Sequence, residues 1–80
     1  MLRLLCVKGS RRYTLYRVYI PVVPETRGPT DMGPFYMSDD YGNRQVVFYD
    51  EYYGLWINSS ERENHSLWVS SGAEFVEVPE

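Results

Sequence analysis

The residues of this 80-residue chain that could do chemistry are few, and they do not form a catalytic set. Nucleophilic catalysis needs a nucleophile, a base and a group that orients the base. Cys6 and His65 are the only cysteine and histidine. Cys6 lies in an apolar stretch, where a buried and inert thiol is the usual outcome. One residue of each type also excludes an intrachain disulfide and a Cys/His zinc site. We therefore expect no catalytic and no metal-binding residue.

Acid–base chemistry and phosphate binding are equally unsupported by the residue pattern. The two adjacent acid pairs lie at 39–40 and 50–51. Neighbours on a strand point to opposite faces, so neither pair converges on one substrate atom. Gly28 and Gly33 lie among prolines and do not lead into a helix, as a phosphate-binding loop would. We predict that the protein is not an enzyme and uses no cofactor.

Basic and tyrosine residues in and next to the first predicted turn form one candidate binding surface. They are Arg11, Arg12, Tyr13, Tyr16 and Arg17. Proteins that bind single-stranded nucleic acid combine cationic groups with aromatic rings in this way. The chain nevertheless has a net charge of −3, whereas such proteins usually carry a basic surplus. We therefore interpret the cluster first as a solvated turn and rank nucleic acid below protein as the partner.

The densest aromatic cluster is a second candidate surface, for a protein partner. It contains Tyr52, Tyr53, Leu55 and Trp56. Tyrosine and tryptophan dominate the binding energy of protein interfaces. The alternative is that Tyr53 and Trp56 fill the core. Aromatic residues make up 16% of the chain, and a domain this small is not expected to bury all of them.

These residues must be positioned by β-strands, because Val, Tyr, Phe, Trp and Thr dominate the apolar segments and alanine occurs once. The length allows one domain, residues 1–80. Short alternating segments predict strands at 2–7, 13–23, 35–38, 45–49, 55–58, 66–69 and 74–78. Turn signals separate them, and we expect an all-β fold, a small five- to six-stranded SH3-like barrel or rolled antiparallel sheet.

Three segments between the predicted strands carry specific expectations. Residues 24–34 hold three prolines and two glycines and predict a long loop. Residues 58–65 form a polar insertion. Residues 39–43 predict a hairpin turn, in which Gly42 supplies the left-handed position and Asp40 bonds its own backbone.

The order of these features resembles the short SH3-like β-barrel proteins of bacteriophages and prophages. The resemblance rests on four segments, Leu5–Lys8, Tyr13–Tyr19, Asp39–Arg44 and Gly72–Val78. Tyr16 departs from the pattern, because it stands where that family usually has a turn glycine. The resemblance implies the fold and a viral or prophage origin. It implies no activity, since many such proteins have none assigned.

From these observations we expect a non-enzymatic phage accessory protein that binds a host bacterial protein and modulates or inhibits it. The alternatives are a small barrel that binds single-stranded nucleic acid and a structural homo-oligomer, such as a homodimer. Residues 1–8 are too short and too charged for a signal sequence, and no apolar run reaches membrane-spanning length. We therefore expect a protein of the host cytoplasm without a membrane partner.

Overall fold

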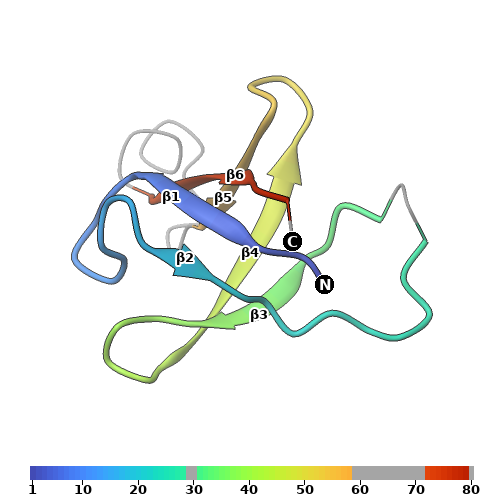
Figure 1. The fold of residues 1–80 in the computed structure, drawn as a ribbon, viewed down its shortest axis with the longest axis horizontal. Coiled ribbons are helices and arrows are strands. Elements are labelled where there is room, and N and C mark those ends of the chain that lie inside the picture. The colour runs from blue at the N-terminus through green and yellow to red at the C-terminus, as the bar shows by residue number, and fades with distance from the viewer. Residues whose placement is uncertain (29–30, 59–71, 80) are drawn as a thin grey trace.

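The computed structural model describes residues 1–28, 31–58 and 72–79, which form one curled sheet (Figure 1). Its six strands are β1 (Leu4–Lys8), β2 (Val18–Tyr19), β3 (Phe35–Ser38), β4 (Arg44–Asp50), β5 (Leu55–Asn58) and β6 (Glu74–Glu77). They lie in the order β2-β1-β6-β5-β4-β3, and each pair of neighbours is antiparallel. The described part of the chain contains no helix. The all-β, rolled antiparallel architecture expected from the sequence is confirmed.

The two edges of the sheet meet, so that the sheet curls towards a barrel. Val22, just after β2, forms an isolated bridge with Tyr36 on β3, and its N–H donates to the Tyr36 carbonyl at 2.7 Å. Pro21 interrupts the second strand immediately before this bridge and has no N–H to donate. The described backbone pairing between the two edges is therefore limited to this single bridge.

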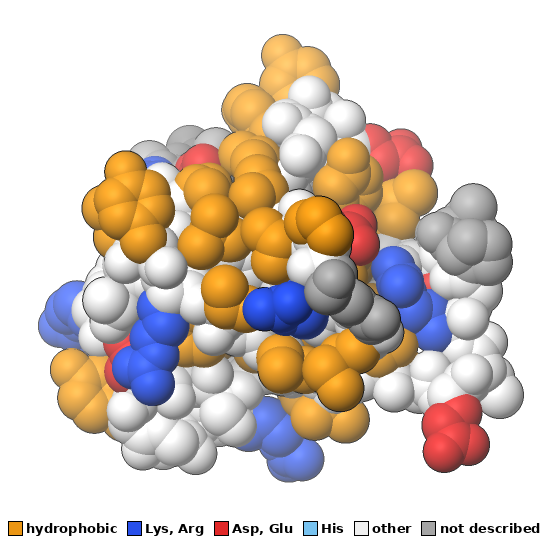
Figure 2. Space-filling model, in the orientation of Figure 1, with side chains coloured by type: hydrophobic (Ala, Val, Ile, Leu, Met, Phe, Trp, Pro, Cys, Tyr) orange, Lys and Arg blue, Asp and Glu red, His pale blue; other side chains and the backbone are white. Residues whose placement is uncertain are grey.

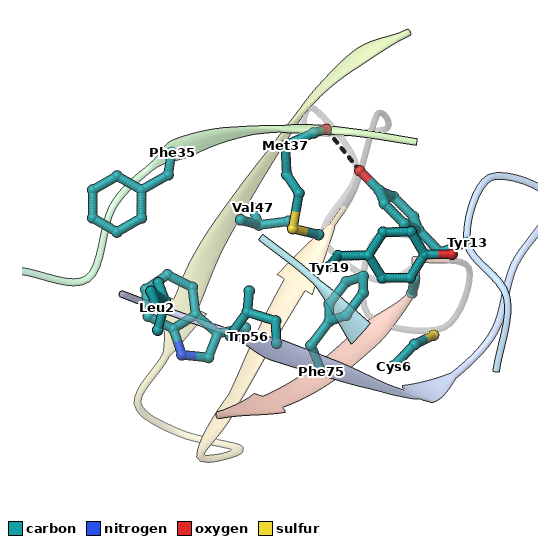
Figure 3. Packing of buried hydrophobic residues seen from close by; sticks show 11 residues of the cluster. Leu2, Cys6, Tyr13, Tyr19, Phe35, Met37, Val47, Trp56 and Phe75 are labelled. Carbon is teal, nitrogen blue, oxygen red and sulfur yellow. Dashed lines mark hydrogen bonds between the residues drawn. The ribbon is translucent and has the colours of Figure 1, made fainter. Parts of the chain in front are cut away.

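Period-two alternation places the core on the concave side of the sheet. In β1, Leu4 and Cys6 are fully buried and Val7 is exposed. The buried cluster is Leu2, Leu4, Cys6, Tyr13, Tyr19, Phe35, Met37, Val47, Trp56, Ala73 and Phe75 (Figure 3). The Tyr13 ring meets Tyr19 at 4.8 Å and Phe75 at 5.1 Å between centroids, both edge to face. This geometry suits the quadrupoles of aromatic rings.

The β3–β4 hairpin forms as predicted, and Gly42 has a positive φ of 80°. One detail of the prediction is wrong, because Asp39 rather than Asp40 caps the turn. The Asp39 Oδ1 accepts the N–H groups of Tyr41 and Asn43, each at 2.9 Å. Asp39 is the first residue of the turn, where an aspartate side chain reaches the amides that follow. The Asp40 carboxylate is instead directed at another segment.

The second strand is much shorter than the predicted 13–23, because only Val18 and Tyr19 join the ladder. A turn in which the Arg17 N–H donates to the Thr14 carbonyl at 3.2 Å replaces its beginning. The described residues of the predicted 24–34 loop contain no strand. The predicted strand at 66–69, and the insertion at 58–65 apart from Asn58 in β5, lie outside the described residues.

Candidate interaction surfaces

The turn between β4 and β5 presents two tyrosine rings on a backbone that is held by its own hydrogen bonds. The Asp50 Oδ1 accepts the N–H of Tyr52 at 2.9 Å and that of Tyr53 at 3.2 Å. Gly54, with a φ of 67°, donates its N–H to the Asp50 carbonyl at 2.8 Å. This turn projects beyond the body of the sheet, as the yellow loop in Figure 1 shows. We call residues Glu51, Tyr52 and Tyr53 the aromatic tip.

The structure separates the four residues of the predicted protein-binding cluster. Tyr52 is 86% exposed and Tyr53 is 50% exposed, and their rings pack edge to face at 4.7 Å. Leu55 is half-buried, and Trp56 is buried. The Trp56 ring stacks on Phe35 at 5.8 Å, so this side chain belongs to the core. Two of the four predicted residues therefore remain accessible to a partner at the tip.

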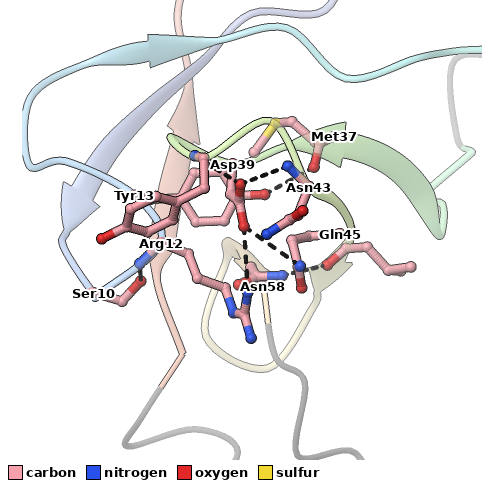
Figure 4. A network of polar contacts seen from close by, with 10 residues as sticks. Ser10, Arg12, Tyr13, Met37, Asp39, Asn43, Gln45 and Asn58 are labelled. Carbon is pink, nitrogen blue, oxygen red and sulfur yellow. Dashed lines mark hydrogen bonds and ion pairs between the residues drawn. The ribbon is translucent and has the colours of Figure 1, made fainter.

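Asp39, in the β3–β4 turn, and Arg12, in the loop between β1 and β2, form the centre of a polar network (Figure 4). The Arg12 Nη1 lies 3.3 Å from the Asp39 Oδ2, and the Gln45 Nε2 donates to the same oxygen at 3.5 Å. Burial raises the pKa of the Asp39 carboxyl, but hydrogen bonds from the amides of Asn43 and Tyr41 and from Arg12 outweigh it. The net pKa lies below the ordinary value, so the carboxylate stays charged at neutral pH.

Asp40 connects the loop between β1 and β2 to the β3–β4 turn through a second set of contacts. Its carboxylate accepts the Tyr19 hydroxyl at 2.6 Å and the Thr14 hydroxyl at 2.7 Å, and the Arg17 Nη1 lies 3.5 Å away. The Tyr19 and Thr14 hydrogen bonds, with the Arg17 charge, lower the pKa of the Asp40 carboxyl. The Asp40 N–H also donates to the Arg12 carbonyl at 2.9 Å. The acid pair at 39–40 therefore joins the β3–β4 turn to the loop between β1 and β2.

These contacts between the two loops occupy several of the residues that were predicted to bind nucleic acid. Tyr13 is buried, and its hydroxyl donates to the Met37 carbonyl at 2.9 Å, so its ring face is not accessible for base stacking. Arg12 and Arg17 are each paired with a carboxylate. Tyr16 and Arg11 are exposed.

A third surface was not predicted from the sequence, and it consists of exposed apolar side chains on β2 and on the residues that follow it. Val18, Ile20 and Val22 are exposed on one parity of the segment that follows the first turn, while Tyr19 and Pro21 on the other parity are buried. The only sequence feature that indicates this surface is the presence of apolar residues on both parities of the segment. This feature is ambiguous, because a strand that is buried on both faces has the same pattern.

Comparison with models of known protein families, with curated proteins and with solved structures finds no match for this chain. Within the described residues, no group of three His, Cys, Asp or Glu side chains is placed to hold a metal ion. The same residues include no helix of the length and apolarity needed to cross a membrane.

Proposed function

We propose that this domain is a phage-encoded accessory protein that acts by binding a host bacterial protein in the cytoplasm and modulating or inhibiting it. In this proposal the domain performs no chemistry of its own. The aromatic tip, where Tyr52 and Tyr53 leave the body of the sheet, is the observation that carries it. The resemblance to phage and prophage SH3-like proteins supports the proposed origin.

The aromatic tip has the physical properties of an interface anchor. Two large apolar rings in water cost free energy that a partner recovers by covering them. The hydrogen bonds to Asp50 already order the backbone of the tip. Binding therefore loses less conformational entropy than it would with a flexible loop. Tyrosine side chains also lose little rotamer freedom when they are covered.

The charge beside the rings indicates which partner surface fits. Glu51 is exposed at the tip, next to Tyr52. Complementary potentials favour encounter and disfavour wrong partners. The proposed partner therefore offers an apolar pocket with basic residues at its rim.

An affinity capture from bacterial lysate tests the proposal when it is combined with matched variants. The immobilised domain is compared with Tyr52→Ala/Tyr53→Ala and with Tyr41→Ala, which removes an exposed tyrosine from the β3–β4 turn. We expect a stoichiometric host protein with the parent and the Tyr41 variant. Its retention by the tip variant should fall at least about 30-fold, since a hot-spot residue contributes about 2 kcal/mol or more. Absence of such a protein, or equal retention by all three, would contradict the proposal.

A further inference from the structure

The turn between β1 and β2 holds Tyr16 in a backbone conformation that favours glycine, with a φ of 68°. Tyr16 is the third residue of the turn from Thr14 to Arg17, the position at which a type II turn requires a positive φ. Tyr16 and Arg17 both oppose Cys6. The Tyr16 N–H donates to the Cys6 carbonyl at 2.8 Å, and the Cys6 N–H donates to the Arg17 carbonyl at 2.9 Å. This is a β-bulge whose first residue is normally glycine.

The Tyr16 side chain does nothing within the described fold that would explain this conformation. It is 74% exposed, and in the described part of the chain it takes part in no hydrogen bond or ring contact. A left-handed residue other than glycine is strained, and such strain persists where the surrounding structure holds it and is concentrated at functional sites. No contact among the described residues accounts for a tyrosine at this position, and its exposed ring is available to a partner.

Other exposed apolar side chains lie on β1, on this turn and on residues 18–20, which include β2. We call the following residues the N-terminal face: Val7, Leu15, Tyr16, Val18 and Ile20. The register continues this face across the sheet, because Leu5 pairs with Val18 on one side and with Val76 on the other. Figure 2 shows hydrophobic side chains spread over the side that carries β1 and β2, with lysine and arginine side chains among them.

Basic residues are concentrated in the segments that form the N-terminal face. The first 24 residues contain five basic residues and no acid, although the whole chain has a net charge of −3. Three of these cations, Lys8, Arg12 and Arg17, pair with carboxylates from other segments. In every pair the cation is the more exposed member; for Arg17 and Asp40 the side-chain exposures are 65% and 22%. An approaching molecule therefore meets the positive groups first.

We propose that the N-terminal face is a second docking site, which binds an acidic segment with apolar side chains in a partner protein and uses Tyr16 as its anchor. This site differs from the aromatic tip in its charge, because the tip carries Glu51. The domain thus offers two surfaces of opposite preference and can join two protein partners. Protein is favoured over nucleic acid as the occupant, because the face exposes aliphatic side chains such as Leu15 and Val18, which bases do not stack on, and because Tyr13 is buried.

Fluorescence anisotropy with defined probes tests this site. The first probe is a fluorescein-labelled peptide of alternating Glu and Leu, the second has Lys in place of Glu, and the third is labelled oligothymidine. The parent domain is compared with Tyr16→Gly, with Arg11→Gln and with the control Tyr41→Ala. We expect the Glu/Leu peptide to bind the parent most tightly and to weaken as salt rises. Its affinity should fall at least tenfold in Tyr16→Gly, fall less in Arg11→Gln, and stay unchanged in Tyr41→Ala.

The remaining outcomes count against the inference. Equal binding of the Lys/Leu peptide would remove the charge argument, and tighter binding of oligothymidine would assign the face to nucleic acid. Undiminished binding by Tyr16→Gly would remove the anchor. Light scattering that shows Tyr16-dependent self-association would make a second copy of the chain the occupant. Tyr16→Gly is expected to relax the turn and not to destabilise the fold. A urea midpoint at or above that of the parent would therefore show that a loss of binding by this variant is not caused by unfolding.

Discussion

Replacing Tyr16 with glycine is expected to raise the stability of the isolated domain, although the substitution deletes a large side chain. The left-handed conformation at a φ of 68° costs an L-residue about 1–2 kcal/mol, and glycine avoids this cost. Glycine gives back about 0.5–1 kcal/mol, because its unfolded chain is more flexible. The ring of Tyr16 is 74% exposed and makes no hydrogen bond or ring contact among the described residues, so little packing is lost with it. The net expectation is a gain of about 0.5–1 kcal/mol.

Urea unfolding followed by tryptophan fluorescence measures this gain, with Tyr16→Ala as the matched control. Alanine removes the ring but keeps the Cβ that causes the strain, so its midpoint should stay near that of the parent. In a domain of this size a gain of about 0.5–1 kcal/mol raises Tm by roughly 2–8 °C. A Tyr16→Gly midpoint below that of Tyr16→Ala would refute the reasoning, because it would mean that glycine does not relieve strain at this position.

Three further predictions concern the core and the titrating groups. Phe75→Ala empties a fully buried site between Tyr13 and Tyr19 and should cost about 3–5 kcal/mol in urea unfolding; a loss below about 1 kcal/mol would contradict the described core. The pKa of Asp40 is lowered in the folded state, so its stabilisation is present above the ordinary carboxyl pKa and is lost as pH falls through the folded value. Asp40→Asn should therefore flatten the plot of urea midpoint against pH below about pH 5. An unchanged slope would show that the contacts of Asp40 do not stabilise the fold. Burial raises the pKa of Tyr13, so its stabilisation is present below the ordinary tyrosine pKa near 10 and is lost as pH rises through the folded value. Tyr13→Phe removes the hydrogen bond to Met37 and should lower the free energy of unfolding by about 1 kcal/mol at neutral pH, and it should lose less stability than the parent at alkaline pH. A variant that loses as much stability at high pH as the parent would contradict this assignment.

The strands were predictable from sequence wherever one face alternates cleanly. The segment that became β1 showed Leu2, Leu4 and Cys6 on one parity, and these residues are buried. The β3–β4 hairpin followed from the turn residues, which need no long-range information. Local patterns were sufficient in these places, because period-two alternation and the residues of a hairpin turn are visible in adjacent positions of the sequence.

The limits of prediction lie where distant segments decide the outcome. The acid pair at 39–40 carries a turn signal, but no local pattern indicates that Asp40 receives a hydrogen bond from Tyr19, 21 residues earlier. Trp56 and Tyr53 belong to one aromatic cluster in sequence, and only strand pairing separates the core ring from the exposed ring. The second strand was predicted too long because apolar residues on both parities hid the turn at Tyr16.

The placement of the two chain ends determines how the molecule bears mechanical load. The Arg3 carbonyl accepts the Val78 N–H at 3.0 Å, and the Arg3 Nη1 donates to the Pro79 carbonyl at 3.1 Å, so the ends emerge side by side (Figure 1). Since β1 and β6 are antiparallel neighbours, a force applied to both ends opens their ladder one rung at a time rather than shearing all rungs together. Tension applied through the two ends is therefore expected to separate β1 from β6 first.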